Sequence, residues 1–331
     1  MSSVLVIGGT GAMGSRVVLR LLSASAHDLV VLTRNPDSPQ ARRLVGAGSG
    51  RVRAVRGDVN DLAEVRRALE SVDQVFCNTD FKSTGAVTGE YQHGVAILEA
   101  AREAGIDRFV WSSLDFAASL TSGRILVPHY DGKGAVAAHI AMRRSDEMMR
   151  QEADGWYTEH VTVFTTAPYF ENFELRWAPR RGELPDGRDG MLFAIPLGDR
   201  RCPLIGLDDI AWFAAYALEN WQSWGARDLA VAGDSLTGDQ IAGAFERVTG
   251  TPAAYASVPL DTVRSSIPDV GHDIAAMFEF FQARDIVAVD RDLNALRVMH
   301  PGLLSFEDWL RASGWDGTGT STNFSACKAG S

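Results

Sequence analysis

Length, composition and charge exclude several classes of protein. The chain has 331 residues, 46% of them hydrophobic, and a formal net charge of −10 at pH 7. This length and apolar content allow a sizeable core in one large domain or two, while an acidic chain has no basic field with which to hold the phosphates of nucleic acid. Direct DNA binding is therefore not expected.

The cysteines and the N-terminus indicate an intracellular protein. Cys77, Cys202 and Cys327 are odd in number and widely spaced, and no paired-cysteine motif or histidine cluster accompanies them to close a metal site. The N-terminal MSSVLVIGG lacks a basic region, and no apolar run reaches the roughly 18 residues that a membrane span needs. We expect a cytoplasmic protein, with the nucleus as an alternative, and neither a metal ion nor a membrane anchor.

The first 165 residues alternate short β-branched runs with longer amphipathic stretches. This rhythm predicts an α/β fold with a Rossmann-type, doubly wound parallel sheet over residues 1–167. Strands are expected at 4–7, 29–32, 52–55, 74–76, 108–111 and 161–164. Helices are expected from Gly14, from Leu62 and over 87–105, with Gly105 as the C-cap of the third.

The rhythm breaks from Pro168 onward. Residues 173–203 are rich in Trp, Arg, Gly and Pro, which predicts irregular loops with one short strand at 191–195. Helices are expected at 207–221, 235–250 and 273–283, and a last folded element at 304–315. We predict a smaller C-terminal α+β subdomain for substrate or partner over 168–315, with room for segments that return to the Rossmann core, and a mobile tail at 316–331.

Three glycines follow the first strand. Gly8, Gly11 and Gly14 stand at the start of a helix, where backbone N–H groups can approach a pyrophosphate at the positive helix end. Glycines also serve ordinary strand–helix turns. The strand–glycine–helix context favours the dinucleotide interpretation.

The tip of the second strand predicts which dinucleotide binds. NAD-binding chains place an acidic residue there, whereas this strand ends in Thr33, Arg34 and Asn35. Arg34 can meet a 2′-phosphate with a forked, charge-assisted contact. The alternative is a solvated loop cation. The sequence therefore favours NADP over NAD.

Two further strand ends carry polar groups at the carboxyl edge of the sheet, where open α/β sheets bind ligands. Asp58 and Val59 follow the third strand, and the Asp58 carboxylate could accept from an adenine amino group. Alternatively, Asp58 supports the turn and Asp61 caps the next helix. Asn78 and Thr79 follow the fourth strand, with their backbone toward the middle of the cofactor.

Residues 127–136, VPHYDGKGAV, contain a lysine but lack a tyrosine four residues before it, a spacing that on a Rossmann-type scaffold would indicate a proton-relay reductase. His129 stands four residues before Lys133, and Tyr130 three. Either could present a proton beside the cofactor, or either could simply pack the loop.

The start of the helix around this lysine decides the geometry of both candidates. Pro128 and the glycines at 132 and 134 favour a helix that begins only near Lys133, with Asp131 as N-cap. Helical spacing is then not expected for His129 or Tyr130.

Six motifs together resemble the NmrA-like family, atypical members of the short-chain dehydrogenase/reductase superfamily, in its NADP-binding, redox-sensor-like branch. They are GGTGAMG, LTRN, RGDVND, RFVWSSL, VPHYDGKG and APYFENF. The resemblance implies a Rossmann domain with a smaller C-terminal subdomain. It assigns Gly8, Thr10, Gly11, Ala12, Met13 and Gly14 to the pyrophosphate loop, Arg34 to the 2′-phosphate, Asp58 and Val59 to the adenine side, Asn78 and Thr79 to the ribose side, and Lys133 to the nicotinamide ribose.

Two functions of different classes stay open. The first is an NADPH-dependent oxidoreductase acting on a medium-sized aromatic or heterocyclic carbonyl, imine, quinone or enone, in the manner of secondary-metabolism enzymes. Its catalytic candidates are Ser113, His129, Tyr130 and Lys133, and its expected pocket wall is Tyr169, Phe170, Phe173 and Trp177. The second is a non-catalytic NADP(H) sensor that regulates a protein partner. Either function leaves room for a homodimer.

Overall fold

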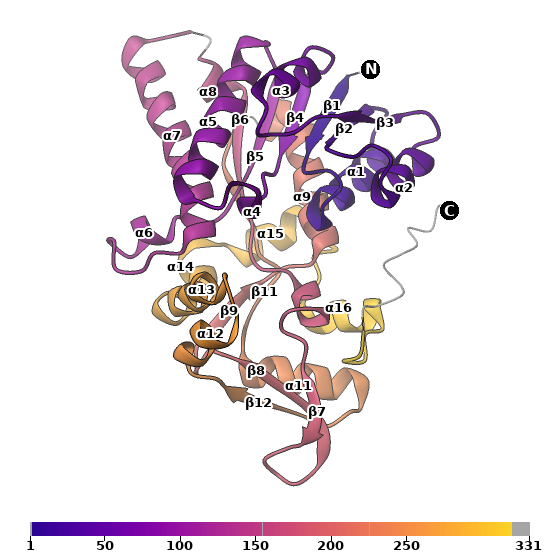
Figure 1. The fold of residues 1–331 in the computed structure, drawn as a ribbon, viewed down its shortest axis with the longest axis vertical. Helices are drawn as coiled ribbons and strands as arrows, with labels where there is room; N and C mark the ends of the chain where they lie inside the picture. The colour runs from indigo at the N-terminus through magenta and orange to yellow at the C-terminus, as the bar shows by residue number, and fades with distance from the viewer. Residues whose placement is uncertain (1, 154, 225, 320–331) are drawn as a thin grey trace. The chain divides into compact units, whose positions relative to one another are not determined.

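A seven-stranded parallel sheet forms the centre of the first unit of the chain in the computed structural model, which describes residues 2–153, 155–224 and 226–319 (Figure 1). Unit 1 holds the residues up to Thr166 together with Ile210–Ala230. Unit 2 holds Ala167–Asp209 together with the described residues from Val231 onward. Of the tail expected at 316–331, residues 320–331 lie outside the described part.

The strand order of unit 1 is that of a doubly wound Rossmann-type sheet. The sequence of neighbours is β10-β6-β5-β4-β1-β2-β3, so β1 pairs with both β2 and β4 and the chain reverses direction across the sheet there. The strands are β1 (Ser3–Ile7), β2 (Asp28–Thr33), β3 (Val52–Arg56), β4 (Gln74–Cys77), β5 (Arg108–Ser113), β6 (Val161–Thr165) and β10 (Leu229–Ala230). The six strands expected from apolar runs are confirmed, and β10 is added from the segment that follows α9.

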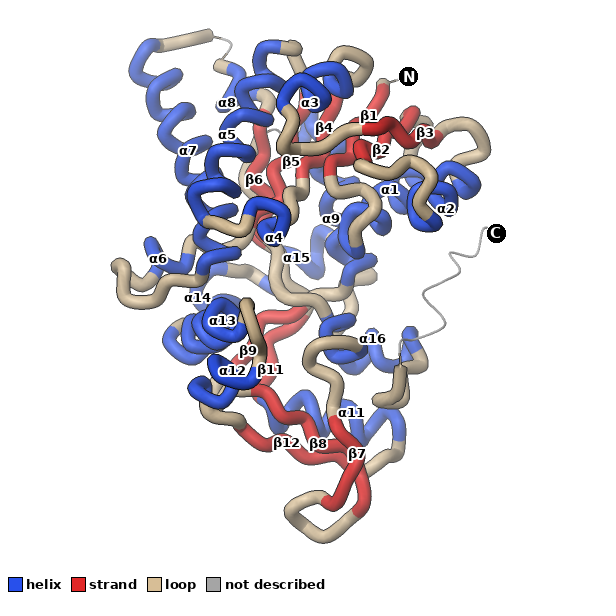
Figure 2. The backbone as a smooth tube through the Cα atoms, viewed as in Figure 1, coloured by secondary structure: helices blue, strands red, loops and turns tan. Residues whose placement is uncertain are grey.

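Helices alternate with these strands along unit 1 (Figure 2). They are α1 (Ala12–Ala24), α2 (Pro39–Ala47), α3 (Leu62–Leu69), α4 (Phe81–Thr84), α5 (Val87–Glu103), α6 (Ala117–Leu120), α7 (Pro128–Arg150), α8 (Trp156–Glu159), α9 (Leu207–Glu219) and α10 (Trp221–Trp224). Gly105 follows α5 with a φ of 68°, as expected of a residue that ends a helix. The boundary between the units falls inside α9, after Asp209.

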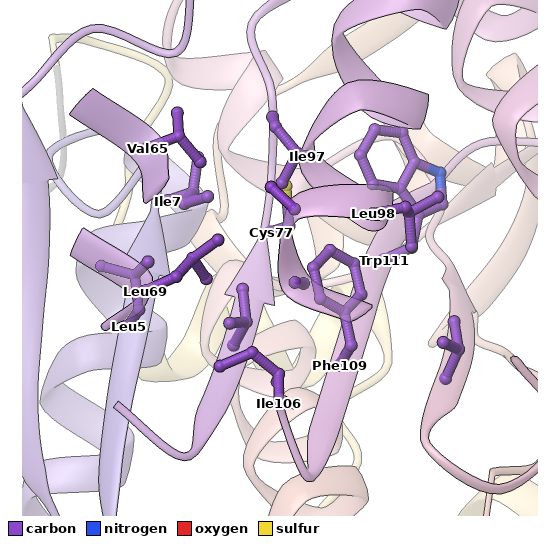
Figure 3. Close-up of a cluster of buried hydrophobic side chains, with 14 of the residues drawn as sticks. Leu5, Ile7, Val65, Leu69, Cys77, Ile97, Leu98, Ile106, Phe109 and Trp111 are labelled. Carbon is purple, nitrogen blue, oxygen red and sulfur yellow. The ribbon is translucent and has the colours of Figure 1, made fainter. Parts of the chain in front are cut away.

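One face of the sheet packs against α3, α5 and α7. Leu5 and Ile7 on β1 share a fully buried cluster with Val65 on α3, Leu98 on α5 and Trp111 on β5 (Figure 3). Alternate strand residues point to opposite faces of a sheet, so the residues between them are buried on the other side. Burying a Leu, Ile or Val side chain fully contributes roughly 1.5–3 kcal/mol, and this cluster fixes the positions of α5 and α7.

Helix α7 begins at Pro128, and the prediction that it begins near Lys133 is wrong. Pro128 occupies the first turn, where a missing N–H costs nothing. Asp131 is not the N-cap but lies inside the first turn, where its carboxylate accepts from the N–H groups of Val127 (2.8 Å) and Ala118 (2.9 Å). The four residues 128–131 are therefore helical.

The two glycines of the same stretch have packing reasons that lie on other elements. A Cβ on Gly132 would stand 2.9 Å from the Glu90 Cβ on α5, and one on Gly134 would stand 2.6 Å from the Phe116 Cβ. Both distances are too short for carbon atoms, so glycine lets α7 approach α5 and the loop after β5 closely (Figure 1). These glycines allow helix packing and do not delay the helix.

Unit 2 has more strands than the sequence predicted. Its elements are η1 (Phe170–Glu174), β7 (Arg180–Glu183), β8 (Asp189–Ile195), β9 (Arg201–Leu204), β11 (Asp234–Thr237), α11 (Gly238–Thr249), β12 (Ala253–Ser257), α12 (Leu260–Ser266), α13 (Gly271–Ala283), α14 (Ile286–Asp290), α15 (Leu293–Met299) and α16 (Phe306–Ser313). The strands form one sheet of order β12-β8-β7 and a β11-β9 pair. Only β8 was expected, because every residue of β7 is exposed and carries no alternating apolar pattern.

Candidate functional site

The turn between β1 and α1 requires two of its glycines. Gly8 adopts a φ of 79°, and a Cβ on it would lie 2.2 Å from the Asn78 carbonyl oxygen. A Cβ on Gly14 would lie 2.2 Å from the Gly8 carbonyl oxygen. The first turn of α1 has no side-chain cap at Gly11, so its backbone N–H groups remain available at the carboxyl edge of the sheet.

Lys133 is the centre of a hydrogen-bonded group at the end of β4. Its Nζ lies 2.9 Å from both the carbonyl oxygen and the hydroxyl of Thr79, 3.3 Å from Asn78 Oδ1 and 3.2 Å from Glu90 Oε1. An ammonium group has three N–H donors, so protein acceptors can use all of them. The structure thus brings together Asn78, Thr79 and Lys133, which the sequence assigned to the cofactor from two distant segments.

Glu90 balances the charge of this lysine inside the protein. Its side chain is fully buried, and only 7% of Lys133 is exposed. The Thr79 hydroxyl donates to the same oxygen, Glu90 Oε1, that pairs with Lys133. Hydrogen bonds help a buried ion pair to persist, and here Thr79 donates to Glu90 Oε1 and accepts from Lys133.

The neighbouring Cys77 is held as a neutral thiol. Burial raises the pKa of the Cys77 thiol to about 12, while the charge of Lys133 acts in the opposite direction and that of Glu90 in the same direction. A thiol with such a pKa is a poor nucleophile at neutral pH. Cys77 therefore contributes packing at the end of β4 and no reactive sulfur.

Two residues at the end of β5 donate hydrogen bonds to the backbone of α7 at Lys133. Ser113 donates to the Lys133 carbonyl oxygen (3.3 Å) and is 1% exposed. The Trp111 indole N–H donates to the same carbonyl (3.3 Å), and its ring lies 5.3 Å from Lys133 Nζ. In this arrangement the Ser113 hydroxyl anchors the helix, so its predicted role toward a substrate carbonyl would require it to change partner.

His129 and Tyr130 now have defined helical positions relative to Lys133. Residues four apart lie on one helix face and residues three apart lie nearby, so both side chains fall within one turn of the lysine. Tyr130 is 2% exposed and its ring packs edge-on against His129 at 4.8 Å between centroids. His129 is half-buried, with Phe81 edge-on at 6.4 Å. Of the two candidate acids, His129 is the more accessible.

Two arginines stand at the carboxyl ends of β2 and β3. Arg34 is exposed just after β2, and the exposed Arg56 at the end of β3 donates from Nη1 to the Arg34 carbonyl oxygen at 3.1 Å. Within the described residues, neither guanidinium has a carboxylate within 4.0 Å. Two cations without acidic partners therefore give these adjoining strand ends a local positive charge.

The acidic residues after β3 show the structural roles that the sequence left open. Asp61 caps α3, since its Oδ1 accepts from the N–H groups of Ala63 (2.9 Å) and Glu64 (3.3 Å). Asp58 Oδ1 accepts from the N–H of Asn60 at 3.0 Å within the turn. The second oxygen of Asp58 leaves the predicted adenine contact open, and Val59 packs against the core.

The four aromatic residues predicted as a pocket wall lie together in unit 2, but two of them are core side chains. Phe170 and Phe173 have no exposed surface, and their rings lie 5.5 Å and 5.2 Å from that of Phe306. Their spacing of three along η1 places both on one buried face. For these two positions the prediction of a pocket wall is wrong, while Tyr169 and Trp177 remain partly exposed.

A cavity of about 480 Å³ lies elsewhere in unit 2, between the end of β12 and α12. Its lining includes Ser257, Pro259, Arg264 and Gln282, and none of the predicted site residues contributes to it. Within residues 2–153, 155–224 and 226–319, no group of His, Cys, Asp or Glu side chains is placed to hold a metal ion, and no helix combines the length and hydropathy needed to cross a membrane.

Sequence reasoning missed Glu90 and Arg56. Glu90 lies within an amphipathic stretch and looks like one more polar residue of a helix, yet it occurs among residues that this helix buries. Arg56 is the last residue of β3. Since parallel strands end at one edge, its position beside the tip of β2 was available as a signal.

Known proteins resemble this chain over most of its length. An NmrA-like family domain-containing oxidoreductase, hkm9, of Aspergillus hancockii is 28% identical over 258 residues, which are 76% of this chain and 73% of that protein. An NAD(P)H azoreductase of Xenophilus azovorans is 26% identical over 81% of each chain. The crystal structure of NmrA, a negative transcriptional regulator, in complex with NADP superposes with a TM-score of 0.72 at 17% identity over 94% of each chain.

The doubly wound sheet of unit 1 is consistent with that similarity in fold. The family model matches residues 1–310, which include the β1–α1 turn, the Lys133 group and most of unit 2. The match covers far more than half of the chain. The chain belongs to the NmrA-like family.

Proposed function

We propose that the chain is an NADPH-dependent oxidoreductase that transfers a hydride to a medium-sized aromatic or heterocyclic carbonyl, imine, quinone or enone. The observation that carries this proposal is the convergence of the glycine turn, the ends of β4 and β5, and Lys133 at one edge of the sheet. Two contacts show that these segments lie close together: Gly8 packs against the Asn78 carbonyl, and Lys133 donates to the Thr79 carbonyl. Open α/β sheets bind dinucleotides at this edge.

The residues fit NADPH in three respects. Glycine at positions 8 and 14 lets the turn fold tightly beside the end of β4 and lead into α1, whose positive N-terminal end suits a pyrophosphate. The start of α1 has no side-chain cap that would compete for its N–H groups. Arg34 and Arg56 add two positive charges at the adjoining strand ends, which suits the 2′-phosphate of NADPH. No acidic residue stands at the tip of β2 to bind the ribose hydroxyl of NADH.

Bound NADPH supplies the hydride, and the chain must orient the two reactants and deliver a proton. Lys133 holds the loop of Asn78 and Thr79 and, by exchanging one of these acceptors, can reach a ribose hydroxyl. His129 is partly exposed one turn before it and can donate a proton from an imidazole nitrogen to the reduced acceptor. Electron-poor acceptors need the least help with protonation, which is why quinones, imines and enones suit a chain without the usual tyrosine.

Three relatives support a reductase in particular. The proteins similar to this chain include NmrA-like oxidoreductases of fungi and an NAD(P)H azoreductase, an enzyme that by its name reduces an electron-poor group. A place in secondary metabolism is a further part of this proposal. Small-molecule turnover in the cytoplasm is therefore the proposed role.

Turnover assays test this proposal directly. Purified protein should consume NADPH when offered a panel of quinones, enones and cyclic imines, and should consume much less NADH with the same acceptors. His129→Ala, Tyr130→Phe and Lys133→Ala are assayed separately. Unchanged turnover in all three variants would remove the proposed site, and no consumption with any acceptor would reject the enzyme.

A non-catalytic NADP(H) sensor is the second candidate. It is favoured by the absence of a tyrosine four residues before Lys133, by the burial of Tyr130 and by the use of the lysine's donors inside the protein. A sensor must bind NADP⁺ and NADPH with different affinities, because a ligand shifts a population only through differential affinity. Equal affinities, together with no partner recovered by pull-down at either ratio, would count against it.

A further inference from the structure

We propose that Glu90 is a positioning residue for the dinucleotide site: it holds the Lys133 ammonium charged and in place at the end of β4. The proposal rests on the proposed function, because Lys133 is taken there as the cation that meets the cofactor. It adds to that function a residue from α5 that no motif of the glycine turn or of the lysine segment includes. The argument depends on burial, on the use of each oxygen and on the packing of α5 against α7.

The contacts of Glu90 are concentrated on one oxygen. Oε1 pairs with Lys133 Nζ at 3.2 Å and accepts the Thr79 hydroxyl, whereas Oε2 has no hydrogen-bond partner among the described residues. Glu147, another buried glutamate of unit 1, behaves differently. Its two oxygens accept from the Tyr157 N–H at 2.9 Å and from the N–H and hydroxyl of Thr158 at 2.8 Å.

The contrast indicates that Glu147 has a structural role, whereas Glu90 provides a negative charge beside Lys133. Glu147 satisfies backbone groups at the start of α8 and would do so in any buried capping role. Glu90 leaves a buried carboxylate oxygen unsatisfied, which is unfavourable for the folded state. We infer that the unsatisfied Oε2 is tolerated because of the contacts of Oε1. Glu90 Oε1 pairs with Lys133 and accepts the Thr79 hydroxyl.

The packing of the two helices is adapted to the same glutamate. Gly132 stands one residue before Lys133, and a Cβ there would collide with the Cβ and Cγ of Glu90 at 2.9 Å and 3.0 Å. The glycine therefore lets the glutamate stem pass beside α7 and reach the lysine head. Two positions on separate helices thus serve the placement of one ammonium group.

The other groups around Lys133 cannot replace this carboxylate. From β4 the Cys77 thiol faces it with a pKa raised to about 12 by burial, so that it stays neutral, and from β5 the Trp111 ring contributes only its π face. On α7 itself, His129 lies one turn away and Asp131 accepts backbone N–H groups at the helix start. Removing the α5 carboxylate would leave a buried cation without its anion, which favours the neutral amine.

The test compares NADPH binding across pH in four proteins: the native chain, Glu90→Gln, Glu147→Gln and Lys133→Met. Cofactor fluorescence gives the Kd from about pH 6 to pH 9, a range below the reference titration of a free lysine. Glu90→Gln should approach native affinity at the acidic end and weaken progressively as pH rises, because its lysine loses a proton early. At the alkaline end its Kd should meet that of Lys133→Met, about ten-fold or more above the native value.

Glu147→Gln is the matched control for burial. It should lower the melting temperature and yet give a pH profile parallel to that of the native chain, because its contacts do not reach the cofactor site. A Glu90→Gln profile that is also parallel to the native one overturns the proposal. A Lys133→Met variant with native affinity overturns it as well, since the ammonium would then have no part in cofactor binding.

A second measurement needs no cofactor and decides the matter if the native chain does not bind NADPH, in which case the proposed function itself fails. Melting temperatures are taken for Glu90→Gln, Lys133→Met and the double variant. Losing one partner of a buried pair is more destabilising than losing both, so the double variant should melt above Glu90→Gln. A double variant that melts at or below Glu90→Gln shows that no such pair exists and rejects the role of Glu90.

Discussion

Arg34 and Arg56 stand at the ends of adjoining strands, and we propose that their side chains distinguish a nucleotide with a 2′-phosphate from one without it. Arg56 holds the Arg34 backbone through its own guanidinium at 3.1 Å. The cofactor prediction made from Arg34 alone is supported by the NAD(P)H-dependent relative. The second arginine extends it from a single cation to a pair.

Replacing either arginine should change cofactor preference. Arg34→Gln and Arg56→Gln should each weaken NADPH roughly ten-fold, because a charge-assisted contact contributes about 1.5–3 kcal/mol when made to a charged group, while NADH binding stays the same. Titration with both cofactors measures the ratio. Arg53→Gln, near the other end of β3, is the control, since Arg53 donates to the Ser71 hydroxyl. Equal losses for NADPH and NADH in Arg56→Gln would contradict a phosphate contact.

His129 offers the second test at the scale of a residue. If it delivers the proton, His129→Ala should lower kcat by roughly 10²–10⁴-fold, the usual contribution of a general acid, and leave the NADPH Kd unchanged. Steady-state kinetics with the best acceptor and a separate binding titration distinguish the two effects. His272→Ala, an exposed histidine of unit 2, should match the native chain. A rise in KM without a fall in kcat would assign His129 to substrate packing.

The packing of α5 against α7, where Glu90 lies beside Gly132, positions the Lys133 side chain. Gly132→Ala would place a methyl group 2.9 Å from the Glu90 Cβ, so we expect destabilisation of about 1–3 kcal/mol from overpacking together with weaker NADPH binding. Urea unfolding measures the first and fluorescence the second. Gly46→Ala in α2, with open space around it, should instead be neutral or stabilising by up to about 1 kcal/mol. Equal behaviour of the two variants would mean that the helices adjust freely.

Elements with a strong local pattern could be predicted from the sequence, and elements fixed by distant neighbours could not. The apolar run before Gly8 and the amphipathic stretch after Leu62 gave β1 and α3 correctly. The start of α7 was mistaken because the reason for Gly132 lies on another helix, at Glu90. Likewise, the roles of Glu90 and Phe173 depend on contacts with residues distant in sequence, Lys133 and Phe306, which the local sequence pattern does not reveal.

The site divides in the same way. Residues of the glycine turn and of the β4 end follow from strand–turn–helix order, which is local, and the structure brings Gly8, Asn78 and Lys133 together. Phe170 and Phe173 were expected in a pocket because aromatic residues serve pockets and cores alike. Their partners, Phe306 and Trp309, are more than a hundred residues further along the chain, so that the distinction needed a structure.

At the scale of the whole molecule, unit 1 is completed by a segment that returns after the chain has entered unit 2. Asp228 lies in that segment, and its carboxylate accepts from Arg144 Nη1 at 2.9 Å and 3.0 Å and from the Val163 N–H at 3.0 Å. Arg108 Nη1 donates to the Leu218 carbonyl oxygen at 2.7 Å. The nucleotide-binding unit is therefore not a contiguous stretch of sequence.

This arrangement predicts the effect of a remote substitution. Asp228→Ala removes the ion pair with Arg144 and the acceptor of the Val163 N–H on β6, and should destabilise the protein by about 1–3 kcal/mol. Chemical denaturation followed by circular dichroism measures the change. Asp199→Ala, whose side chain is 90% exposed, should stay within about 0.5 kcal/mol of the native chain. A native-like Asp228→Ala would show that the returning segment contributes little to unit 1.

The early start of α7 has an evolutionary meaning. Because the helix runs unbroken from Pro128, position 129 already stands four residues before Lys133 in continuous helical geometry. Histidine and tyrosine codons differ by a single nucleotide. The step from this chain to the tyrosine–lysine pair of ordinary short-chain reductases is therefore one point mutation, His129→Tyr, on a backbone that needs no insertion or shift of register to receive it.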